Sequence, residues 1–193
     1  MLILIRHGQI QSNVLRLLDT ALPGPDLTDT GRSQATTAGE KLGQRFGAGI
    51  KIYASKAQRA RSTAELIAAN AGWDYQGTIP GVAELDAGDW QLSGEEEKMA
   101  AYLDVLHQWI SGNPAPQVPG GETFEAAAAR ARAGLGALTT GPEPVAVVSH
   151  GAFSRLALSV ISDVDPDYCI NHPFKNCEGA VVHDGAITHW GAF

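Results

Sequence analysis

Cysteine and positive charge are both scarce in this sequence of 193 residues. The two cysteines, Cys169 and Cys177, fit neither a C-x-x-C motif nor the spacing of a zinc site, so we expect free buried thiols. Lysine and arginine number 14 against 21 aspartate and glutamate residues, which gives a formal net charge of −7. A field of this sign repels nucleic acids and anionic membranes, so we expect neither as a partner. A small anionic substrate would need a local basic pocket.

Long hydrophobic runs are also absent. No apolar stretch approaches the roughly 20 residues that a membrane-spanning helix needs. The opening run from Leu2 to Ile5 is too short for the core of a signal peptide. These observations predict a cytoplasmic protein. The chain length suits one substantial hydrophobic core, so we expect a single domain over residues 1–193.

Three common site motifs are missing as well. The sequence holds no G-x-x-x-x-G-K-[ST], no G-x-G-x-x-G after a strand and no G-x-S-x-G elbow. Interpretations as a nucleoside-triphosphate, dinucleotide or serine-hydrolase site therefore lose their main support. Several histidines lack the spacing of metal ligands, and we expect no metal site and read them as structural or exposed: His107, His172, His183 and His189.

Apolar strands alternate with amphipathic helices along the chain. We expect strands near residues 2–5, 50–54, 144–148, 180–182 and 187–190. We expect helices near residues 10–17, 28–46, 55–71, 95–111, 122–138 and 151–161. Ser55 is the expected N-cap of the third helix, and Glu122 is expected to start the fifth at the positive end of its dipole. The alternation predicts an α/β fold: a single three-layer domain with a mostly parallel central sheet and helices on both faces.

Two histidines share the same local context. His7 and His150 each follow an apolar strand directly, and each is followed by a glycine that opens a predicted helix. Ligands of open α/β sheets bind at the carboxyl ends of the strands, where helix N-termini offer unpaired N–H groups to an anion. Gly8 and Gly151 allow the backbone to approach such an anion closely. The pattern indicates that both imidazoles face one anion site.

Arginines add fixed positive charge near these histidines. Arg6 precedes His7, and Arg59 and Arg61 lie just beyond the strand at 50–54. Guanidinium groups match phosphate oxygens geometrically, so a phosphate pocket is expected in an otherwise acidic protein. Phosphoryl transfer needs a nucleophile, charge stabilisation on the phosphoryl oxygens and an acid for the leaving oxygen. The chain holds residues of all three kinds.

Several motifs resemble those of the histidine phosphatase superfamily, also called phosphoglycerate mutase-like, and they follow its order and spacing. They are RHGQIQSN at 6–13, LTDTGRSQA at 27–35, SKAQRARSTA at 55–64, AELDAGDWQ at 83–91, PGGE at 119–122 and SHG at 149–151. The resemblance spans nearly the whole chain. It implies the fold of that family and an enzyme that needs neither metal nor organic cofactor.

The resemblance also assigns roles to residues. His7 corresponds to the residue that is phosphorylated in turnover, and water then attacks the phosphohistidine. Glu84 corresponds to the proton donor, although Asp86 and Asp89 lie in the same loop. The motif spacing selects Arg59, and Arg61 is interpreted as a solvated helix charge. The catalytic candidates are therefore His7, Glu84 and His150. The phosphate-binding candidates are Arg6, Asn13, Arg59 and Gly151, and His150 is expected to bind the phosphoryl oxygens as well.

Three functions compete at this stage. The segment at 15–25 holds a single arginine, where mutases of the family carry basic residues for the substrate carboxylate, and the segment between Glu84 and Gly120 is short. Both features favour a phosphomonoesterase that hydrolyses a small phosphorylated metabolite. The alternatives are a phosphoglycerate-type phosphomutase and a catalytically silent phosphate-binding module. None of the key residues is missing, which speaks against the silent module. Homodimerisation is left open.

Overall fold

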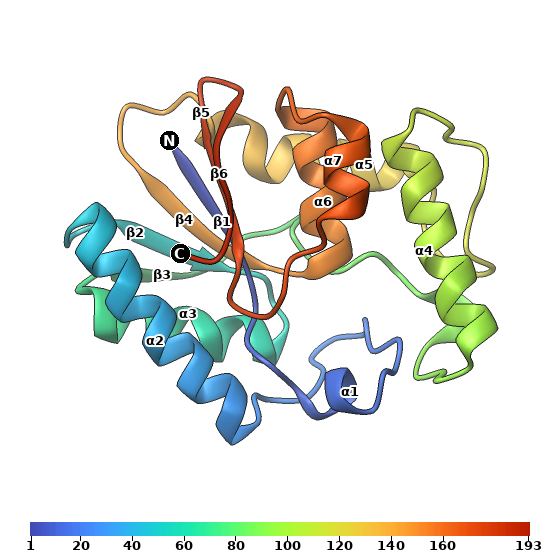
Figure 1. The fold of residues 1–193 in the computed structure, drawn as a ribbon, viewed down its shortest axis with the longest axis horizontal. Helices are drawn as coiled ribbons and strands as arrows, with labels where there is room; N and C mark the ends of the chain where they lie inside the picture. The colour runs from blue at the N-terminus through green and yellow to red at the C-terminus, as the bar shows by residue number, and fades with distance from the viewer.

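The computed structural model describes residues 1–193. Six strands form one sheet in the order β3-β2-β4-β1-β5-β6 (Figure 1). The strands are β1 (Leu2–Arg6), β2 (Lys51–Ala54), β3 (Asp74–Thr78), β4 (Val145–Ser149), β5 (Gly179–His183) and β6 (Ala186–Gly191). The four strands β3, β2, β4 and β1 run parallel, and β5 is antiparallel to both β1 and β6. The predicted α/β domain with a mostly parallel sheet is confirmed.

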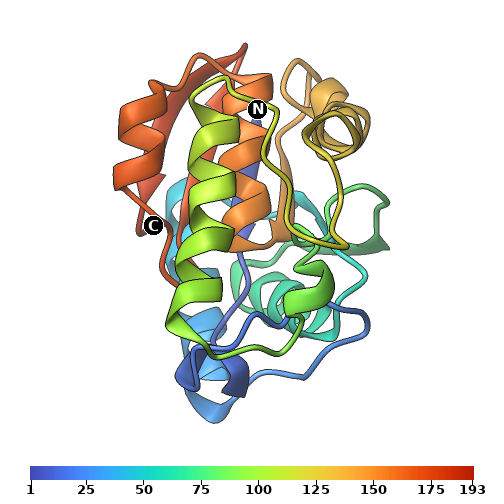
Figure 2. The same ribbon diagram turned by 90° about the vertical axis from the view of Figure 1, so that its right-hand side faces the viewer.

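Helices cover both faces of the sheet (Figures 1 and 2). They are α1 (Gln11–Val14), α2 (Asp29–Phe46), α3 (Gln58–Ala71), α4 (Glu96–Ile110), α5 (Phe124–Leu135), α6 (Gly151–Ile161) and α7 (Pro166–Asn171). Side chains of a strand alternate between faces, so Ile3 and Ile5 of β1 join one core with α2 and α3, while Leu2 and Leu4 join the other with α4, α5 and α6. Figure 2 shows α4 lying alongside α6.

The pairing of β1 with β4 brings the two histidine motifs together. The parallel register places Arg6 opposite Ser149. The next residues along the two strands are His7 and His150, and the His7 backbone N–H donates to the Ser149 carbonyl over 3.0 Å. The two imidazoles therefore leave the sheet side by side at the carboxyl edge of its parallel strands, as the sequence predicts.

The segment after His7 differs from the expected helix over 10–17. Only Gln11–Val14 is helical, and Arg16 has a φ of +54°, which a right-handed helix cannot contain. Ile10 forms an isolated bridge with Leu27, and the Leu18 N–H donates to the Ser93 carbonyl over 3.0 Å. These tertiary hydrogen bonds replace the helical ones and turn the segment into a wall of a cavity.

Two expected helix starts also move. The N-cap of α3 is Ala57 rather than Ser55, whose hydroxyl instead hydrogen-bonds to His150 at the end of the neighbouring strand β4. The helix α5 begins at Phe124 with Thr123 as its N-cap, so Glu122 lies outside it.

Sequence analysis did not predict two elements. The strand β3 lies at the edge of the sheet and has no apolar run, and the helix α7 is only six residues long, too short for a clear helical pattern. Both cysteines are free and buried, as predicted, and no helix is long and apolar enough to cross a membrane.

Candidate active site

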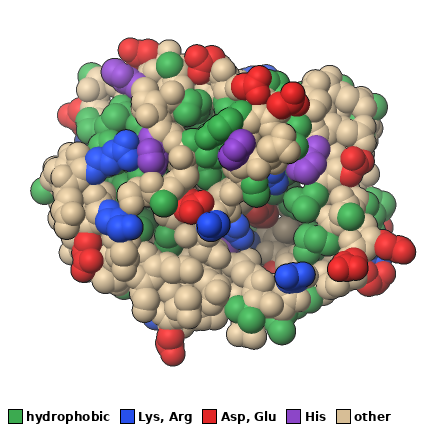
Figure 3. Space-filling model, in the orientation of Figure 1, with side chains coloured by type: hydrophobic (Ala, Val, Ile, Leu, Met, Phe, Trp, Pro, Cys, Tyr) green, Lys and Arg blue, Asp and Glu red, His purple; other side chains and the backbone are tan.

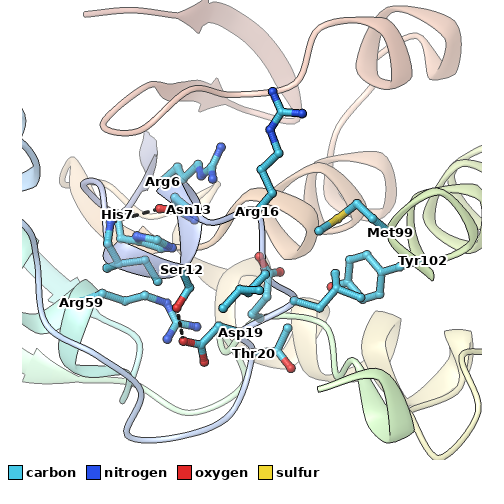
Figure 4. A pocket seen from close by; sticks show the side chains of 14 residues that line it. Arg6, His7, Ser12, Asn13, Arg16, Asp19, Thr20, Arg59, Met99 and Tyr102 are labelled. Atoms are coloured by element: carbon cyan, nitrogen blue, oxygen red, sulfur yellow. Dashed lines mark hydrogen bonds between the residues drawn. The ribbon is translucent and has the colours of Figure 1, made fainter. Parts of the chain in front are cut away.

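A cavity of about 300 Å³ opens at the carboxyl edge of the parallel strands. Figure 3 shows the molecular surface hollowed on this face, with basic and acidic side chains at the hollow. In Figure 4, Arg6, His7, Asn13 and Arg59 lie on one side, and Met99 and Tyr102 of α4 on the other. The lining residues are Arg6, His7, Ile10, Ser12, Asn13, Arg16, Leu17, Leu18, Asp19, Thr20, Arg59, Glu84, Met99 and Tyr102.

His7 is held in one tautomer by its own neighbour. Its Nδ1 lies 2.7 Å from the Gly8 carbonyl oxygen, which can only accept, so Nδ1 carries the proton. Gly8 is fixed on both sides, because its N–H donates to the Thr63 hydroxyl over 3.0 Å and the Gln9 N–H of the next peptide donates to Gln34 over 2.9 Å. Burial, together with the charges of Arg59 and Arg6, holds the pKa of His7 well below its usual 6.5. The ring is therefore neutral near pH 7, and its lone pair is on Nε2.

His150 is fully buried beside His7, with the ring centroids 5.3 Å apart. Its Nε2 lies 2.8 Å from the Ser55 hydroxyl oxygen. That oxygen accepts from the Ala57 N–H over 3.3 Å, so the Ser55 hydroxyl can donate its own proton to Nε2. In this arrangement the ring proton of His150 is on Nδ1. That Nδ1 is buried and has no partner in the protein. Burial and Arg59 hold the pKa of His150 well below 6.5.

Two arginines lie at the cavity without a carboxylate partner, Arg59 buried and Arg6 half-buried. Arg59 is only 1% exposed, and its Nε and Nη1 have no hydrogen-bond partner. Arg6 donates through Nη1 to the Phe174 carbonyl over 2.6 Å, but its Nε has no partner. Neither forms an ion pair. Burial lowers the pKa of both guanidinium groups, and the charge of Glu84 opposes that effect. Buried charge of this kind favours an anionic ligand.

Asn13 lines the cavity with its amide oxygen already engaged. Its Oδ1 accepts from the Ile10 N–H and from Asn176 Nδ2, each over 3.2 Å. Asn176 also donates to the His7 carbonyl over 3.0 Å. With its oxygen engaged, Asn13 keeps its Nδ2 donors for a ligand, which suits the predicted phosphate contact.

The Glu84 carboxylate occupies the N-terminus of α6. It accepts from the Phe153 N–H over 2.7 Å, from the Ala152 N–H over 3.2 Å and from the Leu85 N–H over 2.9 Å. We expected the N–H groups of this helix to hold the anion directly, and that expectation is wrong for these two amides. Gly151 packs against the Arg6 guanidinium. Its N–H does not donate to Glu84, so this amide of the helix N-terminus remains available to a ligand.

The structure brings most of the predicted site residues together. The five that line the cavity are Arg6, His7, Asn13, Arg59 and Glu84. His150 and Gly151 are not among the lining residues, but the His150 ring lies edge-to-face with that of His7. The loop acids Asp86 and Asp89 are not among the lining residues, and neither is Arg61, which contacts Gln58 on its own helix. The choices of Glu84 and Arg59 from the motif register thus agree with the geometry.

Sequence analysis missed several residues that support the site. Ser55 was assigned to a helix cap, and Asn176 lies in a region without a recognised motif. Asp19 accepts from the Ser12 hydroxyl over 2.5 Å at the cavity wall. The contacts of Ser55 and Asn176 join distant segments, so no local pattern could have indicated them, whereas Ser12 and Asp19 lie on one segment that sequence analysis interpreted as a helix. The structure contains no group of three or more His, Cys, Asp or Glu side chains that could hold a metal ion.

Comparisons with known proteins agree with this geometry. The family model of the histidine phosphatase superfamily (branch 1) matches residues 2–185. A 2,3-bisphosphoglycerate-dependent phosphoglycerate mutase of Methylocella silvestris is 33% identical over 177 residues, which cover 86% of this chain and 83% of the relative.

Solved structures share the fold. One described as mycobacterial hydrolase 1 has a TM-score of 0.74 and 26% identity, and the match covers 93% of this chain and 86% of the other. A mycobacterial glucosyl-3-phosphoglycerate phosphatase has a TM-score of 0.74 and 23% identity, with coverage of 100% and 98%. The sequence motifs, the paired histidines at the sheet edge and the family match lead to one conclusion: this chain belongs to the histidine phosphatase superfamily.

Proposed function

We propose that this protein is a metal-independent phosphomonoesterase that hydrolyses a small phosphorylated metabolite through a phosphohistidine at His7. One observation carries the proposal. The neutral His7 ring has its lone pair on Nε2, and it lies beside Arg6 and Arg59, two cations without a carboxylate partner. A nucleophile and an electrostatic clamp for the phosphoryl oxygens therefore share one cavity.

The first half-reaction follows from these positions. His7 Nε2 forms a bond to phosphorus, the bond between phosphorus and the alcohol oxygen breaks, and Glu84 gives a proton to that oxygen. Arg6, Arg59 and the Nδ1–H of His150 bind the phosphoryl oxygens, and Asn13 and the Gly151 N–H add donors. The Nδ1–H of His7 stays on the Gly8 carbonyl, which stabilises the ring as it gains positive character.

The second half-reaction releases phosphate. Water attacks the phosphohistidine, the nitrogen–phosphorus bond breaks, and the Glu84 carboxylate accepts a proton from the water. The arginines neutralise the phosphoryl charge throughout, so this chemistry requires no metal ion.

The leaving-group side of the cavity favours hydrolysis over mutase activity. A bisphosphate intermediate would carry a second phosphate and a carboxylate, yet Arg16 is the one further cation that lines the cavity. The remaining wall holds apolar groups such as Leu17 and Met99 together with the carboxylate of Asp19. The segment 85–118 contains no arginine and one lysine, Lys98, which pairs with Glu95 over 2.6 Å. The second candidate is the mutase, because the Methylocella relative carries that name at 33% identity.

We expect the purified protein to release inorganic phosphate from phosphomonoesters without a bisphosphate primer, and to do so in the presence of a chelator. A panel of phosphorylated metabolites, assayed for free phosphate, tests this and ranks substrates. The control is His7→Ala, which should release none. Activity that depends on added 2,3-bisphosphoglycerate, with the phosphoryl group retained on an isomeric product, would instead establish the mutase.

The lowered pKa of His7 predicts an acid-tolerant nucleophile. The pKa is below 6.5 in the folded protein, so the ring stays neutral as the pH falls through 6.5 and is protonated only at lower pH. NMR titration of the His7 ring should show the neutral form at pH 6.5. Arg59→Met should raise the midpoint, because it removes a neighbouring positive charge. A wild-type midpoint at or above 6.5 would contradict this account.

Glu84→Gln should slow substrates according to how poor their leaving group is. An alkyl phosphate leaves as a basic alkoxide that needs the proton, whereas p-nitrophenolate leaves readily without it. General acid catalysis contributes about 10²- to 10⁴-fold, which sets the expected difference between the two substrates. Asp86→Asn and Asp89→Asn are the controls and should slow neither selectively. Equal losses on both substrates in Glu84→Gln would show that the acid is another group.

A further inference from the structure

The Glu84 segment is an irregular loop that one arginine ties down. Arg130 of α5 donates through Nη1 to the carbonyls of Gly81 and Ala83 over 2.9 and 2.7 Å. Its Nη2 donates to the Glu84 carbonyl over 3.2 Å. Three backbone groups at and just before the candidate acid thus share a single side chain. No helix or strand supplies these hydrogen bonds, because residues 79–87 lie between β3 and the short 3₁₀ turn at Gly88–Trp90.

Glu122 holds Arg130 in place. Its carboxylate accepts from Arg130 Nε over 2.8 Å and from Nη2 over 2.7 Å, a two-point contact that fixes the plane of the guanidinium. The two side chains are only 21% and 18% exposed. Glu122 Oε1 also accepts from the Asp86 N–H over 3.2 Å. The pair therefore binds the loop on both sides of Glu84.

The same arginine reaches the other support of the Glu84 side chain. Its guanidinium lies over the Phe153 ring, 4.5 Å from the centroid. The backbone N–H of Phe153 makes the shortest hydrogen bond to the Glu84 carboxylate, at 2.7 Å. Arg130 thus contacts both the backbone that carries the acid and the residue that holds its carboxylate.

The loop at 119–122 fits closely against the Glu84 loop. The Asp89 N–H donates to the Pro119 carbonyl over 2.8 Å. A Cβ at Gly88 would lie only 2.2 Å from the same carbonyl oxygen, so no side chain fits there. The P-G-G-E motif at 119–122 therefore packs against the Glu84 loop and supplies the carboxylate that binds Arg130. Its local sequence predicted only that Glu122 would start a helix.

We infer that Arg130, fixed by Glu122, is a positioning residue that sets the place of the Glu84 carboxyl group relative to the leaving oxygen. The inference rests on the proposed function, in which Glu84 is the proton donor. Arg130 does not line the cavity. Its hydrogen bonds reach only Glu122 and the Glu84 loop, whereas Arg6, His7 and Arg59 lie on other segments. Its removal should therefore act mainly on proton transfer. A general acid displaced by about 1 Å can lose about 100-fold in rate.

The test compares Arg130→Met and Glu122→Gln with Glu84→Gln and with a matched control, Arg132→Met, an exposed arginine of the same helix. Rates are measured on an alkyl phosphate and on p-nitrophenyl phosphate. Arg130→Met should slow the alkyl phosphate about 10- to 100-fold more than the aryl one, Glu122→Gln less so, and Arg132→Met not at all. In the Glu84→Gln background, Arg130→Met should add no further selective loss. Equal losses on both substrates would overturn the inference.

A second measurement is independent of activity. The amides of Leu85, Ala152 and Phe153 donate to the Glu84 carboxylate, so their hydrogen exchange reports its position. Exchange at these amides should accelerate in Arg130→Met and Glu122→Gln but not in Arg132→Met. If Glu84→Gln shows no leaving-group selectivity, Glu84 is not the proton donor. In that case the hydrogen-exchange measurement alone tests whether Arg130 positions the Glu84 carboxylate. Unchanged exchange at all three amides would overturn it.

Discussion

The unpaired charge of Arg6 and Arg59 is the constraint on which the site depends. Both guanidinium groups lie at the carboxyl edge of the sheet with buried nitrogens that have no partner and no carboxylate to offset their charge, an arrangement that costs free energy. Burial, together with the field of these arginines, lowers the pKa of His7 and keeps its ring neutral near pH 7, so the same charges that would bind the phosphoryl oxygens also help to prepare the nucleophile. An anion that enters the cavity supplies the missing counter-charge. The overall charge of −7 repels anions from the rest of the surface, so a small anion is expected to bind at this local basic pocket.

Glu84 introduces the opposite charge without neutralising the arginines. Its carboxylate accepts from N–H groups of α6 and forms no ion pair with Arg6 or Arg59. This separation lets one cavity hold both an electrophilic clamp and a proton donor. It also requires the Glu84 loop to be held firmly, because a loop without regular structure would otherwise allow the carboxylate to reach the arginines. The hydrogen bonds of Arg130 meet that requirement.

The sequence predicts the part of the site that is local. His7 and His150 are recognisable because each ends an apolar strand, and the parallel pairing of β1 and β4 then places them together. Contacts between distant segments are not encoded in any local pattern. Ser55 reaches His150 across 95 positions, and Arg130 reaches Gly81 across 49. The expected helix at 10–17 failed for the same reason, since Ile10 and Leu18 form their backbone contacts with Leu27 and Ser93.

The central claim is that a phosphoryl group passes through His7. Its most direct test is to mix the enzyme with a phosphomonoester labelled at phosphorus, quench within the first turnovers at alkaline pH, where phosphohistidine survives, and map the labelled peptide. The account predicts acid-labile label on His7 in the wild-type protein and none in His7→Ala. Label on a different residue, or turnover by His7→Ala at the wild-type rate, would contradict it.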